Sequence, residues 1–140
     1  MTNSALRLLA EDQGDLDVIA SALQDAVAKI GDIKFERRGR RLTIAFNRYR
    51  WEGPGGERVR TILQFGSVIG VQARRLRPGV KDAVLELLTL SFQPQQAPGG
   101  LISLQFAGDG DLQVAVECID AIMADVSAPW PTPRRPQHEA

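Results

Sequence analysis

The sequence is poor in the residues that most often carry catalysis or bind metal ions. Its 140 residues include one cysteine, Cys118, and one histidine, His138. A single cysteine excludes an internal disulfide framework and indicates a reducing compartment such as the cytoplasm. A Ser-His or Cys-His pair needs a histidine held near its nucleophile, and a zinc site needs several Cys and His ligands together. We therefore expect neither a metal nor another cofactor, and catalysis is disfavoured.

Long apolar runs are missing as well. No run reaches the length of about 18 apolar residues that a membrane-spanning helix needs. The first residues do not combine a basic start, an apolar core and a small-residue cleavage site, so secretion is not indicated. A hydrophobic content of 44% with zero net charge argues against wholesale disorder. We expect one cytoplasmic folded domain over residues 1–126 and a proline-rich tail over 127–140, and whether Trp130 docks that tail stays open.

Hydrophobic periodicity predicts one helix near the start of the chain. Apolar residues recur at helical spacing from Leu16 to Ile30. Asp12 or Asp15 can cap the first turn, and Gly31 suits the residue that ends the helix. After Gly31, alternation of apolar and polar residues predicts seven strands, over 33–36, 42–51, 58–65, 68–73, 84–92, 101–106 and 112–116.

Three of the later segments need comment. The run 84–92 is compatible with a strand or a helix. Gly108-Asp109-Gly110 is typical of a hairpin turn, and its surroundings lack the further oxygen ligands of a calcium loop. Residues 117–126 have apolar side chains on one helical face, which predicts a short C-terminal helix with Cys118 buried near its start.

The order of these elements predicts the fold class. We expect an α+β protein with a predominantly antiparallel sheet. Seven strands followed by a helix is the element order of pleckstrin-homology-like barrels, in which a C-terminal helix caps a bent seven-stranded antiparallel sheet. The prediction is such a barrel with an additional N-terminal helix.

Zero net charge conceals strong segregation of charge along the chain. Residues 37–81 have a net charge of +10, whereas residues 1–36 and 82–126 have −4 and −7. Fourteen of the seventeen basic residues are arginines. Eight of these lie close together in the sequence, namely Arg37, Arg38, Arg40, Arg41, Arg48, Arg50, Arg58 and Arg60.

The strands 42–51 and 58–65 predict an arginine-rich hairpin. A symmetric turn between them places Arg50 opposite Arg58 and Arg48 opposite Arg60, with the four side chains pointing outward at its tip. Like charges directly across a strand pair are unfavourable, by about 0.2–1 kcal/mol for each pair. An anionic counterpart is therefore expected at this face, which we interpret as the contact surface together with the arginines of segment 37–41.

Several counterparts are compatible with this face. The first is the chain's own acidic side chains, Glu52 and Glu57 among them. The second is a protein partner or a second copy of the chain, because segregated charge steers association. The third is an anionic ligand, since arginine binds phosphate and carboxylate groups in a bidentate manner. An isoelectric point near 6.6 and only 6% aromatic residues argue against nucleic acid.

We interpret the chain as a non-catalytic binding or scaffold module that contacts an anionic protein surface or ligand through the arginine hairpin. The alternative is an enzyme, or an accessory to one, acting on a small phosphorylated or carboxylated metabolite. A deep pocket that brings these arginines together with a buried carboxylate would favour the alternative. Nucleic-acid binding is a further alternative, for which affinity would fall steeply with salt.

Four short segments resemble an uncharacterised alphaproteobacterial family. They are Leu23–Val27, the run Asn47-Arg48-Tyr49-Arg50-Trp51-Glu52, Val116–Ile119 and Pro129–His138. The Asn-Arg-Tyr-Arg-Trp motif is the most specific of them, and it falls in the predicted arginine hairpin. The resemblance covers essentially the whole chain. It implies a small cytoplasmic bacterial protein formed by a domain of unknown function of about this length, and it implies no catalytic or binding residues.

Overall fold

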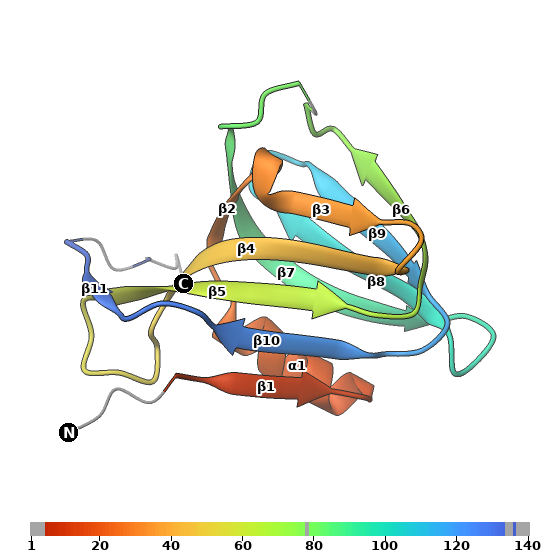
Figure 1. Ribbon diagram of the computed structural model, residues 1–140, viewed down its shortest axis with the longest axis horizontal. Helices are drawn as coiled ribbons and strands as arrows, with labels where there is room; N and C mark the ends of the chain where they lie inside the picture. Colours follow the sequence, from red (N-terminus) through yellow and green to blue (C-terminus); the bar gives the residue numbers. More distant parts are fainter. Residues whose placement is uncertain (1–4, 78, 134–135, 137–140) are drawn as a thin grey trace.

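Eleven strands and one α-helix make up the described part of the chain in the computed structural model (Figure 1). The structure describes residues 5–77, 79–133 and 136. The helix α1 is Gln13–Ala22, and a 3-10 turn covers Ile30–Asp32. The strands are β1 (Arg7–Ala10), β2 (Val27–Lys29), β3 (Ile33–Glu36), β4 (Arg41–Tyr49), β5 (Glu57–Phe65), β6 (Val68–Arg74), β7 (Val84–Pro94), β8 (Gly100–Phe106), β9 (Asp111–Val116), β10 (Ala121–Asp125) and β11 (Trp130–Pro131).

The strands form one open antiparallel sheet that bends back on itself. Hydrogen-bonded neighbours follow the order β1-β10-β5-β4-β2-β7-β8-β9-β6, with β3 paired to β4 and β11 paired to β5. The short strand β2 pairs with both β4 and β7, so it joins a front half (β1, β10, β5, β4, β3 and β11) to a back half (β7, β8, β9 and β6). Figure 1 shows the front half lying across the back half, and the core fills the space between them.

Alternation along the strands builds this core. Ile44 and Phe46 of β4 and Ile102 and Leu104 of β8 are fully buried, whereas the residues between them are more exposed. Successive side chains of a strand point to opposite faces, so these stretches of β4 and β8 bury every second residue. Leu16 of α1 is also buried, because the helix packs on β1 and β7 and closes the gap between them.

The predicted N-terminal helix is confirmed, but it is shorter than expected. Its N-cap is Asp12, whose carboxylate accepts a 2.8 Å hydrogen bond from the Asp15 backbone N–H. The helix ends at Ala22, and Asp25 takes a left-handed conformation with a φ of 61°. The chain then pairs with β7, because the Leu87 backbone N–H donates to the carbonyl of Ala26. Sheet pairing therefore overrides the helical periodicity of residues 26–30.

The predicted α+β class and the pleckstrin-homology-like barrel are wrong, because the described residues form an almost entirely antiparallel sheet with a single α-helix. Residues 121–125 form strand β10 between β1 and β5 instead of a C-terminal capping helix, and the sheet is open and has eleven strands in the described residues. Met123 is buried and Ile122 is less so, which is the alternation of a strand. Cys118 is partly exposed and precedes β10, so its predicted burial in a helix is also wrong.

The other strand predictions hold, with boundaries shifted by a few residues. The ambiguous run 84–92 is part of β7, and the glycine-rich turn around Asp109 joins the antiparallel pair β8 and β9. In the tail, Trp130 pairs with Arg58 of β5 through the backbone. The boundary at residue 126 between domain and tail stays a prediction. None of the helical segments described is long and apolar enough to cross a membrane.

Candidate functional site

The register of β4 and β5 differs by one residue from the predicted one. Tyr49 lies opposite Arg58, Arg48 opposite Val59, and Asn47 opposite Arg60. The turn begins at Trp51, and the Arg50 backbone N–H donates to the carbonyl of Glu57. A slip of one residue moves side chains to the opposite face of a strand. As a result, Arg48 points into the protein while Arg58 and Arg60 stay on the outer face.

Arg48 is fully buried and forms the centre of an ion-pair network. Its Nη1 and Nη2 donate to the two carboxylate oxygens of Glu52 at 2.9 and 2.7 Å. Its Nε and Nη2 donate to the two oxygens of Asp125 at 2.9 and 2.8 Å. Asp125 also accepts hydrogen bonds from the Thr61 hydroxyl and the Leu6 backbone N–H. We call Arg48, Arg50, Glu52, Glu57 and Asp125 the buried ion-pair network.

Arg50 extends this network and is 7% exposed. Its Nη1 donates to Glu57 at 2.5 Å, and its Nε lies 3.8 Å from Glu52. The aromatic residues of the motif support the turn, since the Tyr49 and Trp51 rings lie 4.7 Å apart and the Tyr49 hydroxyl accepts a bond from the backbone N–H of Gly56. The Asn-Arg-Tyr-Arg-Trp-Glu segment therefore closes and fills this end of the front half.

The electrostatics of the network favour its charged form. Burial alone would lower the pKa of Arg48, but its hydrogen bonds to Glu52 and Asp125 outweigh burial and raise that pKa. The hydrogen bond from Arg48 lowers the pKa of Glu52. Burial opposes ionisation of Asp125, and the bonds from Arg48, Leu6 and Thr61 together still lower its pKa. Two arginines facing three carboxylates leave no cationic excess here.

Arg58 and Arg60 have partners on the outer face. Arg60 donates to the side-chain oxygen of Asn47 at 3.1 Å and to Asp32 at 2.9 Å. Arg58 donates to the backbone carbonyl of Asn47, and partial burial lowers its pKa. The expected outward patch of four arginines is therefore corrected. Two of the four are buried in the network, and the other two bind groups of the same chain.

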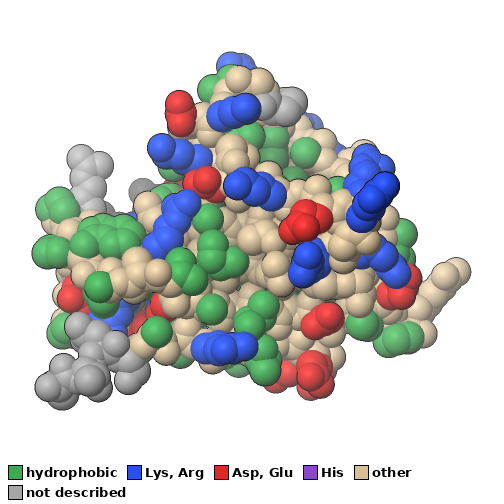
Figure 2. All heavy atoms as spheres, in the orientation of Figure 1, with side chains coloured by type: hydrophobic (Ala, Val, Ile, Leu, Met, Phe, Trp, Pro, Cys, Tyr) green, Lys and Arg blue, Asp and Glu red, His purple; other side chains and the backbone are tan. Residues whose placement is uncertain are grey.

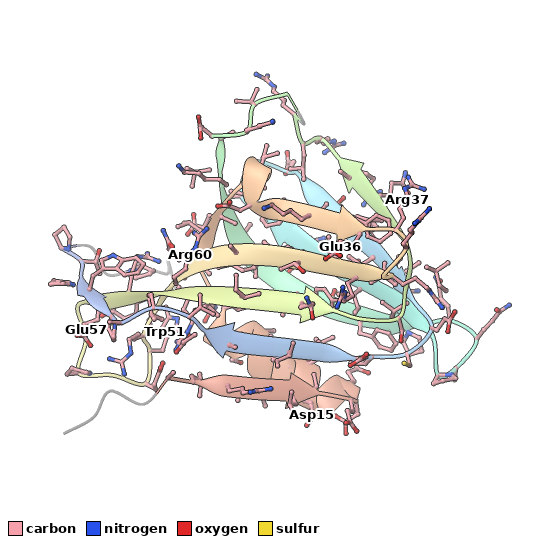
Figure 3. All side chains as sticks on the ribbon, viewed as in Figure 1. Asp15, Glu36, Arg37, Trp51, Glu57 and Arg60 are labelled. Atoms are coloured by element: carbon pink, nitrogen blue, oxygen red, sulfur yellow. The ribbon has the colours of Figure 1, made fainter. Side chains whose placement is uncertain are left out.

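The arginines of segment 37–41 lie elsewhere, in the exposed turn between β3 and β4. Figure 3 shows Arg37 at the opposite end of the front half from Trp51, Glu57 and Arg60. Arg40 pairs with Glu117 and also donates to the Val68 carbonyl, and Arg41 lies 3.4 Å from Glu36. The guanidinium of Arg37 lies 5.8 Å from the Phe35 ring centre. Within the part of the chain that the structure describes, Arg37 and Arg38 have no ion pair.

We call Arg37, Arg38, Arg40 and Arg41 the arginine turn. Four cations face two acidic partners there, and basic side chains gather over this region in the space-filling view (Figure 2). Of the eight arginines predicted to bind, these four alone combine exposure with an excess of positive charge.

A hollow of about 390 Å³ adjoins the arginine turn. It is lined by Phe35 of β3 and by residues of β6, and Arg37 and Arg40 form one side. A second hollow, of about 410 Å³, continues between the same two strands and is lined mainly by apolar side chains. We call the gap between β3 and β6, which both hollows occupy, the seam.

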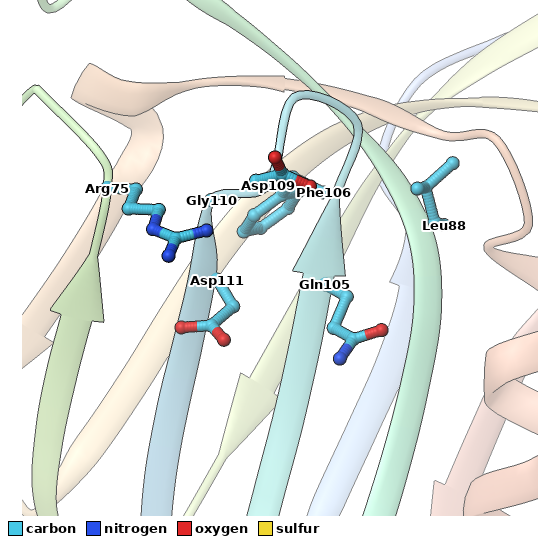
Figure 4. Close-up of a pocket in the computed structure, with 7 residues that line it drawn as sticks. All are labelled: Arg75, Leu88, Gln105, Phe106, Asp109, Gly110 and Asp111. Atoms are coloured by element: carbon cyan, nitrogen blue, oxygen red, sulfur yellow. The ribbon is translucent and has the colours of Figure 1, made fainter.

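Three further hollows bring together opposite charges. One of them, of about 540 Å³, lies beside Arg60 and Lys81 and includes Asp32 and Asp82 in its lining. The one at the β8–β9 turn, of about 290 Å³, contains Arg75, Asp109 and Asp111 (Figure 4). Arg74 holds the Asp111 carboxylate in two hydrogen bonds. The hollow beside Arg50 and the buried Asp125 measures only about 140 Å³. No group of three or more His, Cys, Asp or Glu residues within the described ranges is placed to hold a metal ion. His138 lies outside the described residues.

A family model matches residues 6–138, and its description is a protein of unknown function, DUF2948. The chain belongs to the family DUF2948. The resemblance to a domain-of-unknown-function family of this length is thereby confirmed, while the alphaproteobacterial origin stays a prediction. Neither a curated protein nor a solved structure matches the chain.

The sequence alone did not identify several of the acidic side chains that pair with the arginines of this chain. Asp125, Asp32 and Glu117 lie outside the hairpin in sequence. Asp125 pairs with Arg48 and Asp32 with Arg60 of the hairpin, and Glu117 pairs with Arg40 of the arginine turn. The signal was present in the net negative charge of residues 1–36 and 82–126, and neutralisation by the chain itself was one of the predicted possibilities. The positions of these acids depend on which strands pair, and the chain's local pattern does not specify that.

Proposed function

We propose that this protein is a non-catalytic binding module that contacts an acidic protein surface through the arginine turn. One observation supports the proposal above all others. The arginine turn keeps an excess of exposed positive charge, whereas the arginines of the motif are neutralised within the chain. Clustered guanidinium groups bind carboxylates in a bidentate manner and favour association with a complementary surface.

Hollows of about 390, 410 and 540 Å³ have the size of small-molecule sites, so it is the linings of the hollows that support a binding module over an enzyme. Small-molecule sites usually occupy about 300–1,000 Å³ and bring a few polar groups together inside an apolar cleft. Two hollows join an arginine to a buried carboxylate, Arg50 with Asp125 in about 140 Å³ and Arg75 with Asp111 in about 290 Å³. Both carboxylates already hold ion pairs, Asp125 with Arg48 and Asp111 with Arg74. The hollow at the arginine turn lies between two strands at the surface and has no acidic side chain in its lining.

A selection from a random peptide library tests the proposal. We expect peptides rich in Asp and Glu to be enriched on the immobilised full chain. The double variant Arg37→Glu/Arg38→Glu should weaken binding of a selected peptide by tenfold or more, on the order of 1.4 kcal/mol. Isothermal titration calorimetry gives the affinities.

The control variant is Arg7→Glu/Arg77→Glu, which makes the same change in net charge at two other exposed arginines. Its affinity should stay within about twofold of the parent. Equal losses in both variants would contradict the proposal, because they indicate a response to net charge alone. Enrichment without acidic residues, or binding of inorganic phosphate or duplex DNA in preference to the peptides, would also contradict it.

A further inference from the structure

The two halves of the sheet leave two gaps, and only one of them is sealed. The gap between β1 and β7 is closed by α1, whose Leu16 and Ile19 are buried in the core. The seam between β3 and β6 has no such cover among the described residues. Half-buried apolar side chains line it instead, including Ile33 and Phe35 on one side and Val71 and Leu76 on the other.

Both strands that border the seam have an unpaired edge. Strand β6 ends the path of paired strands and has β9 as its one strand partner, and β3 has β4 as its one strand partner, as far as the described residues show. Backbone hydrogen bonds cross the seam at its two ends, from Val68 N–H to the Arg40 carbonyl and from Gly31 N–H to the Lys81 carbonyl. Between these ends the backbone groups of the edges can pair with an added strand.

The edge of β6 is the longer of the two. After a register shift between Val68 and Gly70, five residues from Gly70 to Arg74 pair continuously with β9. A short extended segment can pair with the other side of a strand of that length, and its alternate side chains then point toward the hollows. Figure 2 shows hydrophobic side chains between β3 and the loop that connects β6 to β7, where the larger hollow lies.

The positive charges at the two ends of the seam favour binding of an acidic segment. Arg37 and Arg40 line the hollow at one end, and Lys81 lines the hollow at the other. No acidic side chain lines either hollow. A segment that fits this arrangement has apolar residues in its middle and Asp or Glu residues at its ends, since its carboxylates then meet cations at both ends of the seam.

We propose that the seam is a docking groove for an extended acidic segment of a partner protein, which pairs its backbone with the free edge of β6. The inference rests on the proposed function, because the arginine turn forms one end of the groove, and it specifies how the partner binds. The bound segment covers Ile69, which is 63% exposed in the free protein, and the apolar side chains that the open seam leaves half-buried.

The test uses the acidic peptide obtained from the library selection and two single variants of the full chain. Ile69→Glu places a carboxylate in the lining of the groove and should weaken binding by tenfold or more. Leu9→Glu makes the same change on the other terminal strand of the sheet, β1, where Leu9 is 61% exposed. Its affinity should stay within about twofold of the parent. Circular dichroism checks that both variants fold.

Amide hydrogen exchange gives an independent readout of strand addition. Saturating peptide should slow exchange in β6 and β3 by tenfold or more, and it should leave exchange in β1 unchanged. Peptide binding that persists in Ile69→Glu, with no slowing in β6, overturns the groove but leaves the proposed function intact if Arg37→Glu/Arg38→Glu still abolishes binding.

The opposite result would support the groove and contradict the contact through the arginine turn. Slower exchange in β6 and loss of affinity in Ile69→Glu support the groove even if the arginine variant binds normally, and the arginine contact then fails. A second copy of the chain in the seam would appear as a dimer in analytical ultracentrifugation that Ile69→Glu converts to a monomer. That result would overturn the assignment to a partner segment.

Discussion

Arg48 has a full charge in the protein interior, and its burial depends on two carboxylates, one near in sequence and one distant. Glu52 comes from the adjacent turn, and Asp125 comes from β10. The Asp125 side chain is itself only 2% exposed. Each charge is therefore stable inside the protein only while its partners remain, because desolvation penalises an unpaired ion by several kcal/mol.

Replacing Arg48 tests this dependence. Arg48→Met keeps much of the side-chain volume but leaves Asp125 buried without its cation, so we expect a loss of about 3–5 kcal/mol in the free energy of unfolding. Urea denaturation followed by circular dichroism measures it. Arg38→Met is the matched control, since Arg38 is exposed in the arginine turn, and it should change stability by no more than about 0.5 kcal/mol. Similar stabilities for the two variants would mean that the buried ion-pair network does not hold this end of the sheet.

The sequence identifies the charged residues, but it does not show which of them are buried and which are exposed. The excess of arginine between residues 37 and 60 is visible directly. Whether the Arg48 side chain points inward or outward depends on the pairing register of β4 and β5. That register depends on where the turn begins, and the turn begins at Trp51 instead of Glu52. Side-chain orientation in a hairpin has a period of two, so an error of one residue exchanged the buried and exposed arginines.

Among the elements, the β7–β8 pair shows how closely packed strands restrict side-chain size. Gly100 lies opposite Pro94, and a Cβ atom placed there would lie 2.5 Å from the Gln93 carbonyl oxygen and 2.4 Å from the Phe92 ring. Part of that obstacle is backbone, which cannot rotate away. An alanine at this position therefore forces the two strands apart.

We expect Gly100→Ala to lower the free energy of unfolding by about 1–3 kcal/mol. Gly70→Ala supplies the comparison, since no atom lies within 4 Å of its added Cβ, and its stability should stay within about 1 kcal/mol of the parent. Thermal unfolding of the two variants in parallel distinguishes them. Equal melting temperatures would show that the β7–β8 pair accommodates the methyl group.

Elements with a strong local pattern were predictable, and elements defined by distant partners were not. The strands β4, β5, β8 and β9 alternate clearly and are joined by recognisable turns. Residues 117–126 satisfy a helical pattern as well as a strand pattern, and β10 forms because two open strand edges, β1 and β5, are available to it. Strand β1 itself has only four residues, which is too few to show a period.

For the molecule as a whole, the buried network makes stability depend on pH. Glu52 and Asp125 have lowered pKa values in the folded protein, relative to the ordinary values of 4.5 and 3.8. As the pH falls toward these ordinary values, the unfolded chain takes up protons before the folded one. The free energy of unfolding is therefore highest above them and decreases as the pH falls further.

We expect urea denaturation to show a decrease in stability between about pH 6 and about pH 3. The decrease should be smaller in Glu52→Gln, which removes one of the carboxyl groups with a lowered pKa. Asp109→Asn, at the exposed β8–β9 turn, should follow the parent curve. If Glu52→Gln also follows the parent curve, the carboxylate of Glu52 does not contribute to the pH dependence.

The place of β10 has a consequence for how the chain is made. Among the described residues, strand pairing connects β1 to β5 through residues 121–125 alone, and the ribosome adds these residues after almost all of the sheet. During synthesis the facing edges of β1 and β5 therefore stay unpaired until β10 is made. A chain truncated before residue 121 would keep both edges unpaired. Contacts between such distant parts of a chain also slow folding. Until β10 pairs with them, β1 and β5 are separate strands that quality-control proteases can reach in the newly made polypeptide.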